Sequence, residues 1–364
     1  MRQLLVFLIF FFVIIALALI ALAIVFPNLL YNVGSSGGAR GLEVSFDGGY
    51  NWQGRNAILN SKTTLLRYKI NDLFFDDQNS DVAYALTDGG IYKSTNQTEL
   101  WFKIGEKDIP SSAKIDSLAL DNINSQRLLI SIFDKNSSQL LKSEDGGNSF
   151  ERLYASPIAG VHINSIVLNN LRGQILLGTS DGGISESRDG GKSWSVLKWM
   201  QGSVSKIFLK NPSDNQYFIL NGTTKLWRMD IDGQNFNEVK IFSVKPAQLG
   251  SVFQSRQIYG VWFDEGSNSI MWAGTSMGLL RSVDGGEKWN AVQTLVPEKS
   301  SRVYAFAQDF LNPQVIYVSM NNKIYKSQDA GAHWSELNFP AKSAIGAIKI
   351  YPQNPSTIFV TGGN

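Results

Sequence analysis

Aspartates recur in this sequence inside a short motif that also contains a serine, a glycine and an aromatic residue. The motif is an octet, Ser-x-Asp-x-Gly-x-x-aromatic, and five stretches match it in full. A positioned carboxylate is one of the groups that enzymes use for proton transfer, so the aspartates need a chemical interpretation first. The five octets are SFDGGYNW (45–52), SEDGGNSF (143–150), SRDGGKSW (187–194), SVDGGEKW (282–289) and SQDAGAHW (327–334).

Repetition favours a structural role for these aspartates over a catalytic one, because five carboxylates spread through a fold do not converge on one substrate. Asp-Gly-Gly between apolar stretches is typical of a hairpin turn, where glycine takes positive φ and aspartate accepts turn amides. The serine bonds locally, and the aromatic ring packs beneath its own turn. The predicted structural positions are Ser45, Asp47, Gly49 and Trp52; Ser143, Asp145, Gly147 and Phe150; Ser187, Asp189, Gly191 and Trp194; Ser282, Asp284, Gly286 and Trp289; and Ser327, Asp329, Gly331 and Trp334.

The spacing of the octets indicates two further, degenerate copies. The octets begin at 45, 143, 187, 282 and 327, so two of the four intervals are close to twice the other two. One copy lies inside each long interval. STNQTELW (94–101) has Asn96 in place of the aspartate, and MDIDGQNF (229–236) has Ile231 there.

The segments between octets have a common pattern of four strands. Residues 70–95 and 303–330 show this pattern. Each segment begins with an apolar strand, a polar turn and a very apolar second strand. A Gly or Asn turn and a third strand then lead into the octet, and a fourth strand follows the octet. Seven such units predict an all-β fold, a seven-bladed β-propeller over residues 39–364, with about 46 residues in each blade.

The ends of the chain predict how this ring closes. GARGLEV before the first octet is long enough for a third strand only, and 344–364 supplies a first strand, a turn and a second strand. We therefore expect the N- and C-terminal strands to share one blade, which removes the exposed edges of an open sheet.

The N-terminus predicts one transmembrane helix. Residues 4–26 are 23 consecutive apolar side chains, which as a helix measure about 34 Å and cross a bilayer of roughly 30 Å. Arg2 in the short start 1–3 favours a cytoplasmic N-terminus and an extracytoplasmic propeller, joined by a Gly/Ser-rich tether at 27–38. A cleavable signal peptide is the alternative, with a small-x-small site at 21–23, but the apolar run continues beyond that site.

Composition excludes several classes of partner. Lys plus Arg number 33 and Asp plus Glu 31, for a net charge of +2 with no long basic run, so no nucleic acid partner is expected. There is no cysteine, and no Cys/His metal spacing or phosphate loop occurs, so neither a cofactor nor a metal is predicted. The acidic stretch FDDQNSD (75–81) lacks the spacing of a calcium loop and is interpreted as a turn.

The octets resemble the Asp-box (BNR) repeat proteins, and this resemblance covers the chain after residue 38. That group includes sialidases, xyloglucanases, the sortilin ectodomain and the photosystem II assembly-factor propellers. The blade count and the repeated GT..G(I/L)..S.DGG..W pattern are most similar to the assembly factors. The motif implies the fold and says little about function.

The enzymes of this group imply features that the sequence lacks. Sialidases need an Arg-Ile-Pro triplet, which is absent, and xyloglucanases place two aspartates between two propellers, whereas this chain has length for one. Two histidines occur: His333 inside an octet, interpreted as a surface residue, and His162, interpreted as structural rather than catalytic. No catalytic residue is predicted.

Binding is therefore the expected function. Connections between blades, and between second and third strands, share one face, on which loop length varies. The longest loop, 243–257, contains the candidate partner-binding residues Lys245, Phe253 and Arg256. The resemblance implies a membrane-anchored scaffold for protein or another macromolecule, with help in assembling a membrane complex as one role; the alternative is an Asp-box glycoside hydrolase or glycan-binding lectin.

The anchor can be tested directly. Because the apolar run is long enough to span a bilayer, the mature protein should retain its N-terminus and stay with membranes after a high-salt wash. N-terminal sequencing and membrane fractionation measure both properties. A purified chain that begins at or after residue 24 would contradict the prediction.

Overall fold

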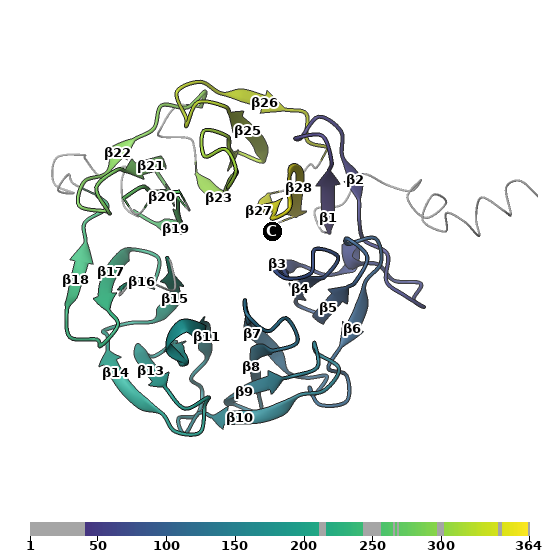
Figure 1. Ribbon diagram of the computed structural model, residues 1–364, viewed down its shortest axis with the longest axis vertical. Helices are drawn as coiled ribbons and strands as arrows, with labels where there is room; N and C mark the ends of the chain where they lie inside the picture. The colour runs from purple at the N-terminus through teal and green to yellow at the C-terminus, as the bar shows by residue number, and fades with distance from the viewer. Residues whose placement is uncertain are drawn as a thin grey trace, which may run out of the picture.

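The computed structural model describes residues 41–210, 216–242, 256–264, 266–267, 269–296, 302–340 and 344–362. These residues form seven four-stranded antiparallel sheets arranged as a ring around a central space (Figure 1). The predicted all-β, seven-bladed propeller is confirmed.

The blades are numbered here in the order of their inner strands along the chain, and the strands of each blade are given from the innermost outwards. Blade 1 contains β3 (Ile70–Phe75), β4 (Ala83–Thr87), β5 (Gly90–Ser94) and β6 (Phe102–Ile104). Blade 2 contains β7 (Lys114–Leu120), β8 (Leu128–Asp134), β9 (Ser137–Ser143) and β10 (Glu151–Ala155). Blade 3 contains β11 (Ile163–Asn169), β12 (Gln174–Thr179), β13 (Gly183–Ser187) and β14 (Ser195–Trp199). Blade 4 contains β15 (Val204–Leu209), β16 (Gln216–Asn221), β17 (Lys225–Asp230) and β18 (Phe236–Val239).

The remaining blades follow the same plan. Blade 5 contains β19 (Ile258–Phe263), β20 (Met271–Thr275), β21 (Gly278–Ser282) and β22 (Asn290–Ala291). Blade 6 contains β23 (Val303–Gln308), β24 (Ile316–Met320), β25 (Lys323–Ser327) and β26 (Ser335–Leu337). Blade 7 contains β27 (Ile345–Tyr351), β28 (Asn354–Gly362), β1 (Leu42–Ser45) and β2 (Gln53–Gly54). Two short 3-10 helices, η1 (Leu65–Arg67) and η2 (Asn170–Arg172), lie in connections.

Antiparallel strands give the ring two different faces. Turns between the first and second strands, called here the inner turns, lie on the same face as the octets, which join the third and fourth strands. We call this the octet face. The described connections between blades, together with the turns between second and third strands, lie on the opposite face, called here the loop face.

The ring closes in blade 7 as predicted. Strand β1, from the start of the described chain, pairs antiparallel with β28, from its end, with Leu42 opposite Thr361 and Ser45 opposite Ile358. The Gly48 amide also donates to the Ser356 carbonyl at 2.8 Å. The two ends of the chain therefore form one sheet, and the circle of blades has no break.

The described core is divided among the contacts between neighbouring blades, which we call seams. Seven clusters of buried apolar side chains each join two adjacent blades. Polar contacts also cross the seams. For example, Lys93 Nζ in blade 1 donates to the Gly146 carbonyl of the blade 2 octet at 2.8 Å, and Lys326 Nζ in blade 6 donates to the Gly48 carbonyl of blade 7 at 3.3 Å. These octets are therefore held by the preceding blade.

Each matching octet is organised by its aspartate. In the third octet, Asp189 Oδ1 accepts hydrogen bonds from Ser187 Oγ (2.8 Å) and from the amides of Lys192 (3.0 Å) and Ser193 (2.9 Å). Ser187 Oγ in turn accepts the Gly191 amide at 2.8 Å, and Trp194 Nε1 donates to the Gly191 carbonyl at 3.0 Å. The tryptophan thus bonds to its own turn, as a structural interpretation requires.

The same hydrogen bonds lower the aspartate pKa values. Side-chain and backbone donors from Ser149, together with Ser143 Oγ, lower the pKa of Asp145 to about 2. A lowered carboxyl pKa adds stability above the unfolded value, near 4, and that stability is lost as pH falls towards 2. The octets are therefore fully stabilised at neutral pH.

The glycine at the fifth position of the octet has no room for a side chain. Gly147 has φ +93°, and a Cβ there would lie 2.4 Å from Ile104 Cδ1 in the preceding blade. Gly49 repeats this arrangement against Leu337. Glycine at this position is needed both for the turn and for close approach of the next blade.

The two degenerate octets keep the turn by different means. Asn96 Oδ1 accepts from Ser94 Oγ and the Leu100 amide, both at 3.0 Å, and so replaces the aspartate directly. In the copy at 229–236, the aligned Ile231 is buried, and Asp230 accepts the Gln234 amide at 2.8 Å instead. The functional equivalent of the aspartate is therefore shifted by one residue.

The aromatic residues of the octets differ in burial. Trp101 and Trp289 are buried, whereas Trp52, Trp194 and Trp334 are partly exposed. The expectation that each ring lies fully beneath its turn is therefore too strong for the latter three.

The predicted membrane anchor lies outside the described residues. Among the helices that the structure does describe, none is long and apolar enough to cross a membrane. The segment 4–26 and the tether 27–38 remain predictions from the sequence.

Removing the closing strands should destabilise the ring. Deletion of 345–364 removes β27 and β28, exposes two strand edges and opens a seam, so we expect insolubility or a large fall in melting temperature. A chain that begins at residue 39 keeps every described strand and is the matched control. If the C-terminal truncation melted like the control, closure through β1 and β28 would not matter for stability.

Substitutions in two octets should separate packing from turn chemistry. Trp289→Ala removes a buried ring and should destabilise by about 3–5 kcal/mol, whereas Trp194→Ala, at a partly exposed ring, should destabilise by only about 2–3 kcal/mol. Asp189→Ala should lower the melting temperature less than either, because its turn amides can bond to water. Chemical denaturation measures all three, and an equal loss for both tryptophans would contradict the burial argument.

Candidate ligand site in the central channel

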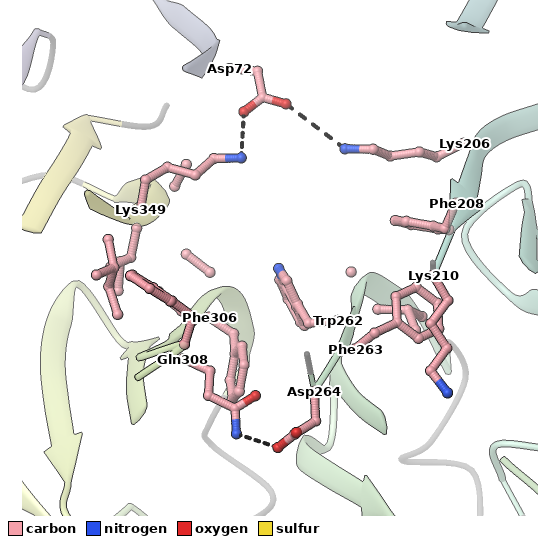
Figure 2. Close-up of a pocket in the computed structure, with 18 of the residues that line it drawn as sticks. Asp72, Lys206, Phe208, Lys210, Trp262, Phe263, Asp264, Phe306, Gln308 and Lys349 are labelled. Carbon is pink, nitrogen blue, oxygen red and sulfur yellow. Dashed lines mark hydrogen bonds and ion pairs between the residues drawn. The ribbon is translucent and has the colours of Figure 1, made fainter. Parts of the chain in front are cut away.

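A cavity of about 850 Å³ lies in the central channel, between inner strands of five blades. Its lining comes from β3, β15, β19, β23 and β27 (Figure 2). The lining begins near the strand starts, at residues such as Asn71 and Tyr304, and continues to the inner turns at Gly266 and Pro352. The cavity therefore follows the strands and reaches the octet face.

A bulge in every inner strand helps to direct side chains into the channel. The register shifts once near the start of each of them, for example between Ile70 and Asp72 in β3 and between Val204 and Lys206 in β15. A bulge adds one residue on one strand and changes the direction of the side chains beside it. Ile70 and Val204 are buried in seams, while Asp72 and Lys206 line the cavity.

Two lysines converge on one carboxylate across the channel. Asp72 Oδ1 lies 3.1 Å from Lys349 Nζ, and Asp72 Oδ2 lies 3.8 Å from Lys206 Nζ (Figure 2). Lys349 comes from neighbouring blade 7, whereas Lys206 comes from blade 4 on the opposite side of the ring (Figure 1). Burial alone would raise the pKa of Asp72, but the two lysines outweigh burial and lower it. The carboxylate is thus ionised and shared.

Aromatic side chains form much of the remaining wall. The ring centroids of Trp262 and Phe306 lie 5.3 Å apart, and those of Tyr259 and Tyr304 lie 4.3 Å apart. Lys206 Nζ also lies 5.6 Å from the centre of the Phe208 ring. The channel therefore combines a charged group with flat apolar surfaces, which is typical of ligand pockets.

Carboxylates at the octet-face end are used mainly to build turns. Asp309 Oδ1 accepts the amides of Leu311 (2.8 Å) and Asn312 (3.1 Å). Asp264 accepts from the Gly266 amide at 2.9 Å and from Gln308 Nε2 at 2.8 Å. Both oxygens of Asp264 and the Oδ1 atom of Asp309 thus accept hydrogen bonds from donors of the fold.

The acidic stretch 75–81 is an inner turn of the same kind. Asp76 Oδ1 accepts the amides of Gln78 (2.8 Å) and Asn79 (3.2 Å), which confirms the interpretation as a turn. Its neighbour Asp77 lines the cavity, and there desolvation and the charge of Asp76 raise the pKa of Asp77. No group of three or more His, Cys, Asp or Glu residues within the described part of the chain could hold a metal ion.

Both histidines bond to aspartates. His162 Nδ1 lies 2.6 Å from Asp116 Oδ2, and the His162 ring stacks on Phe133 with centroids 3.8 Å apart. His333 Nδ1 lies 2.6 Å from Asp329 Oδ2 inside the fifth octet, with its side chain largely exposed. These contacts fit the structural and surface roles assigned from the sequence.

The candidate partner-binding loop is described only at its end. Lys245 and Phe253 lie outside the described residues, so their role remains a prediction. Arg256 lies over the Phe242 ring at 5.5 Å, just before β19, where blade 5 begins on the loop face. The residues of the channel were not predicted from the sequence. The available signal was the aligned inner strands, where Asp72 and Lys206 occupy a position that holds serine, glycine or alanine in the other five blades.

The fold places this chain among the seven-bladed β-propellers, with a polar and aromatic cavity in the channel. No family model matches the sequence. A xyloglucanase from Paenibacillus sp is 22% identical over 332 residues, which cover 79% of this chain and 28% of that protein. The chain therefore spans much less than half of this relative.

Solved structures of two kinds share the fold. The GH74 enzyme of Niastella koreensis has a TM-score of 0.62 and 16% identity, over 80% of this chain and 51% of the enzyme. YCF48 bound to a D1 peptide also has a TM-score of 0.62, with 15% identity over 85% of this chain and 98% of that one. At these identities, the likeness shows the fold alone.

Proposed function

We propose that this protein is a membrane-anchored, extracytoplasmic propeller that binds a protein partner and acts as a scaffold, assisting the assembly of a membrane complex. The observation that carries the proposal is the share of each solved structure that aligns with this chain. The alignment covers 98% of the chain in the structure of YCF48 bound to a D1 peptide, but about half of the GH74 enzyme. A chain of one propeller resembles the peptide-binding protein as a whole and the enzyme only in part.

The channel supports a binding role over hydrolysis. Glycoside hydrolysis needs a general acid and a second carboxylate free to act as base or nucleophile. Among the lining acids, Asp72 is shared by two lysines, and Asp264 and Asp309 accept hydrogen bonds from their turns. These three carboxylates therefore already have partners within the fold.

The partner surface is assigned to the loop face. The sequence predicts that the long 243–257 connection, which joins β18 to β19, contributes to this face, and its Lys245, Phe253 and Arg256 combine cations with an aromatic ring, a composition enriched at interfaces. The octets lie on the opposite face and have structural hydrogen bonds throughout. Binding and stability should therefore respond to different substitutions.

A second candidate function is an Asp-box glycoside hydrolase or glycan-binding lectin. The observation that favours it is Asp77, a cavity-lining carboxyl group whose raised pKa suits a general acid. The similarity to a xyloglucanase adds to this candidate. Hydrolysis would also require a second carboxylate in the cavity that is not already bonded to donors of the fold.

Crosslinking and pull-down from native membranes test the scaffold role. A tagged full chain should retain one defined membrane-protein partner, and Phe253→Ala with Arg256→Ala should reduce its recovery at least tenfold with an unchanged melting temperature. Asp189→Ala on the octet face is the matched control and should retain the partner.

Two results would contradict this assignment. Loss of the partner in Asp189→Ala, with normal melting, would place binding on the octet face. Release of reducing sugar from xyloglucan by the wild type, abolished in Asp77→Asn, would establish the hydrolase instead.

A further inference from the structure

The middle of the channel has more hydrogen-bond donors than acceptors. Two lysines share the single carboxylate of Asp72, which leaves this group of three side chains with a net charge of +1. Lys349 makes the closer contact with Asp72, at 3.1 Å, while Lys206 lies at 3.8 Å with just over half of its side chain exposed. Lys206 can therefore turn to another anion while Asp72 stays paired with Lys349.

A further donor faces the same space. The indole nitrogen of Trp262 points into the cavity (Figure 2), and it donates to no residue in the described part of the chain. An indole N–H can only donate, so its partner in the channel must be an acceptor. Lys206 and Trp262 together favour a ligand that carries oxygen acceptors and a negative charge.

The walls around these donors favour a flat apolar body on the ligand. Phe306 lies against Trp262, and Phe208 lies beside Lys206. The Tyr259 and Tyr304 rings lie together at the other end of the lining. Aromatic rings pack well against planar apolar groups, and a volume of about 850 Å³ lies within the range of small-molecule sites.

A cationic ligand fits this region poorly. Asp72 already has two cationic partners, and Asp264 and Asp309 at the octet-face end accept turn donors. A cation near Lys206 and Lys349 would meet two positive charges and one shared carboxylate.

We propose that the central channel binds an organic carboxylate with a planar apolar body, its charge taken by Lys206 and the Trp262 N–H and its body by the rings of Phe208 and Trp262, with the buried Phe306 supporting Trp262 from behind. This is a ligand site separate from the partner surface on the loop face, and it does not depend on the scaffold role. The carboxylate belongs either to a small organic acid or to the C-terminus of a peptide that enters the channel.

Calorimetric titration of the purified full chain tests the proposal. Phenylacetate should bind saturably, with a Kd of about 0.1–1 mM as expected for so small a ligand, and neutral phenylacetamide should bind at least tenfold more weakly. A tripeptide ending in phenylalanine, with a free or an amidated C-terminus, distinguishes the two sources. Binding of the free peptide but not of phenylacetate assigns the carboxylate to a chain end.

Substitutions in the channel give effects of opposite sign. Lys206→Gln should weaken carboxylate binding about tenfold, and Trp262→Phe should weaken it severalfold while keeping an aromatic wall. Asp72→Asn removes the competing carboxylate and should strengthen binding severalfold, a gain that a merely structural role would not produce. Lys192→Gln, at an exposed lysine of the third octet, is the matched control and should leave the affinity unchanged.

Several results would overturn the proposal. These are the absence of saturable binding by both phenylacetate and the free peptide, equal affinity for the neutral analogues, and weaker binding by Asp72→Asn. A melting temperature measured for each variant shows that the comparison is made between folded proteins.

Discussion

One carboxylate holds each of the five matching octets together, and the arrangement of the blades depends on these octets. Asp189 Oδ1 accepts three hydrogen bonds, which fix the path of a turn that no regular strand pairing holds. In two octets, the turn then presents a glycine carbonyl to a lysine of the preceding blade, at Gly146 and at Gly48. A local hydrogen-bond network thereby helps to set the angle between neighbouring blades, and the sum of those angles sets the width of the channel.

The channel, in turn, is a product of the whole ring. Asp72 and Lys206 lie in blades 1 and 4, far apart in sequence and on opposite sides of the central space (Figure 1). Their contact exists because the inner strands are held at a fixed radius and because a bulge directs each side chain inwards. A propeller whose seams are rigid and apolar can keep charged groups at its axis, because water and opposite charges there offset their desolvation.

The sequence predicted the parts of this structure that depend on local patterns. The repeated octets, the four-strand units and the incomplete ends were enough to predict seven blades and closure between β1 and β28. The shift from Ile231 to Asp230 was missed, because either alignment of a degenerate turn satisfies a pattern of residue types. The different burial of Trp194 and Trp289 was missed because it depends on the side chains of the adjacent blade.

The channel site could not be predicted for a related physical reason. Lysine and aspartate are ordinary residues on a strand, and neither Asp72 nor Lys206 belongs to a motif. They form a site because they lie close together across the axis of the ring, and this proximity arises only when the ring of blades closes. The bulges that aim them also have no residue signature: the residue inserted after Ile70, Val204 or Ile258 is asparagine, serine or tyrosine.

Closure of blade 7 also has a consequence for how the chain folds during synthesis. Strands β1 and β2 are synthesised before the other described strands, yet β1 can pair with β28 only after the strands of blades 1 to 6 have all been made. Until then the growing chain has an unpaired edge, which is a site for aggregation and for recognition by chaperones or proteases. A chain that stalls before β28 keeps this edge exposed, so pairing of β1 with β28 distinguishes a closed ring of blades from an open one.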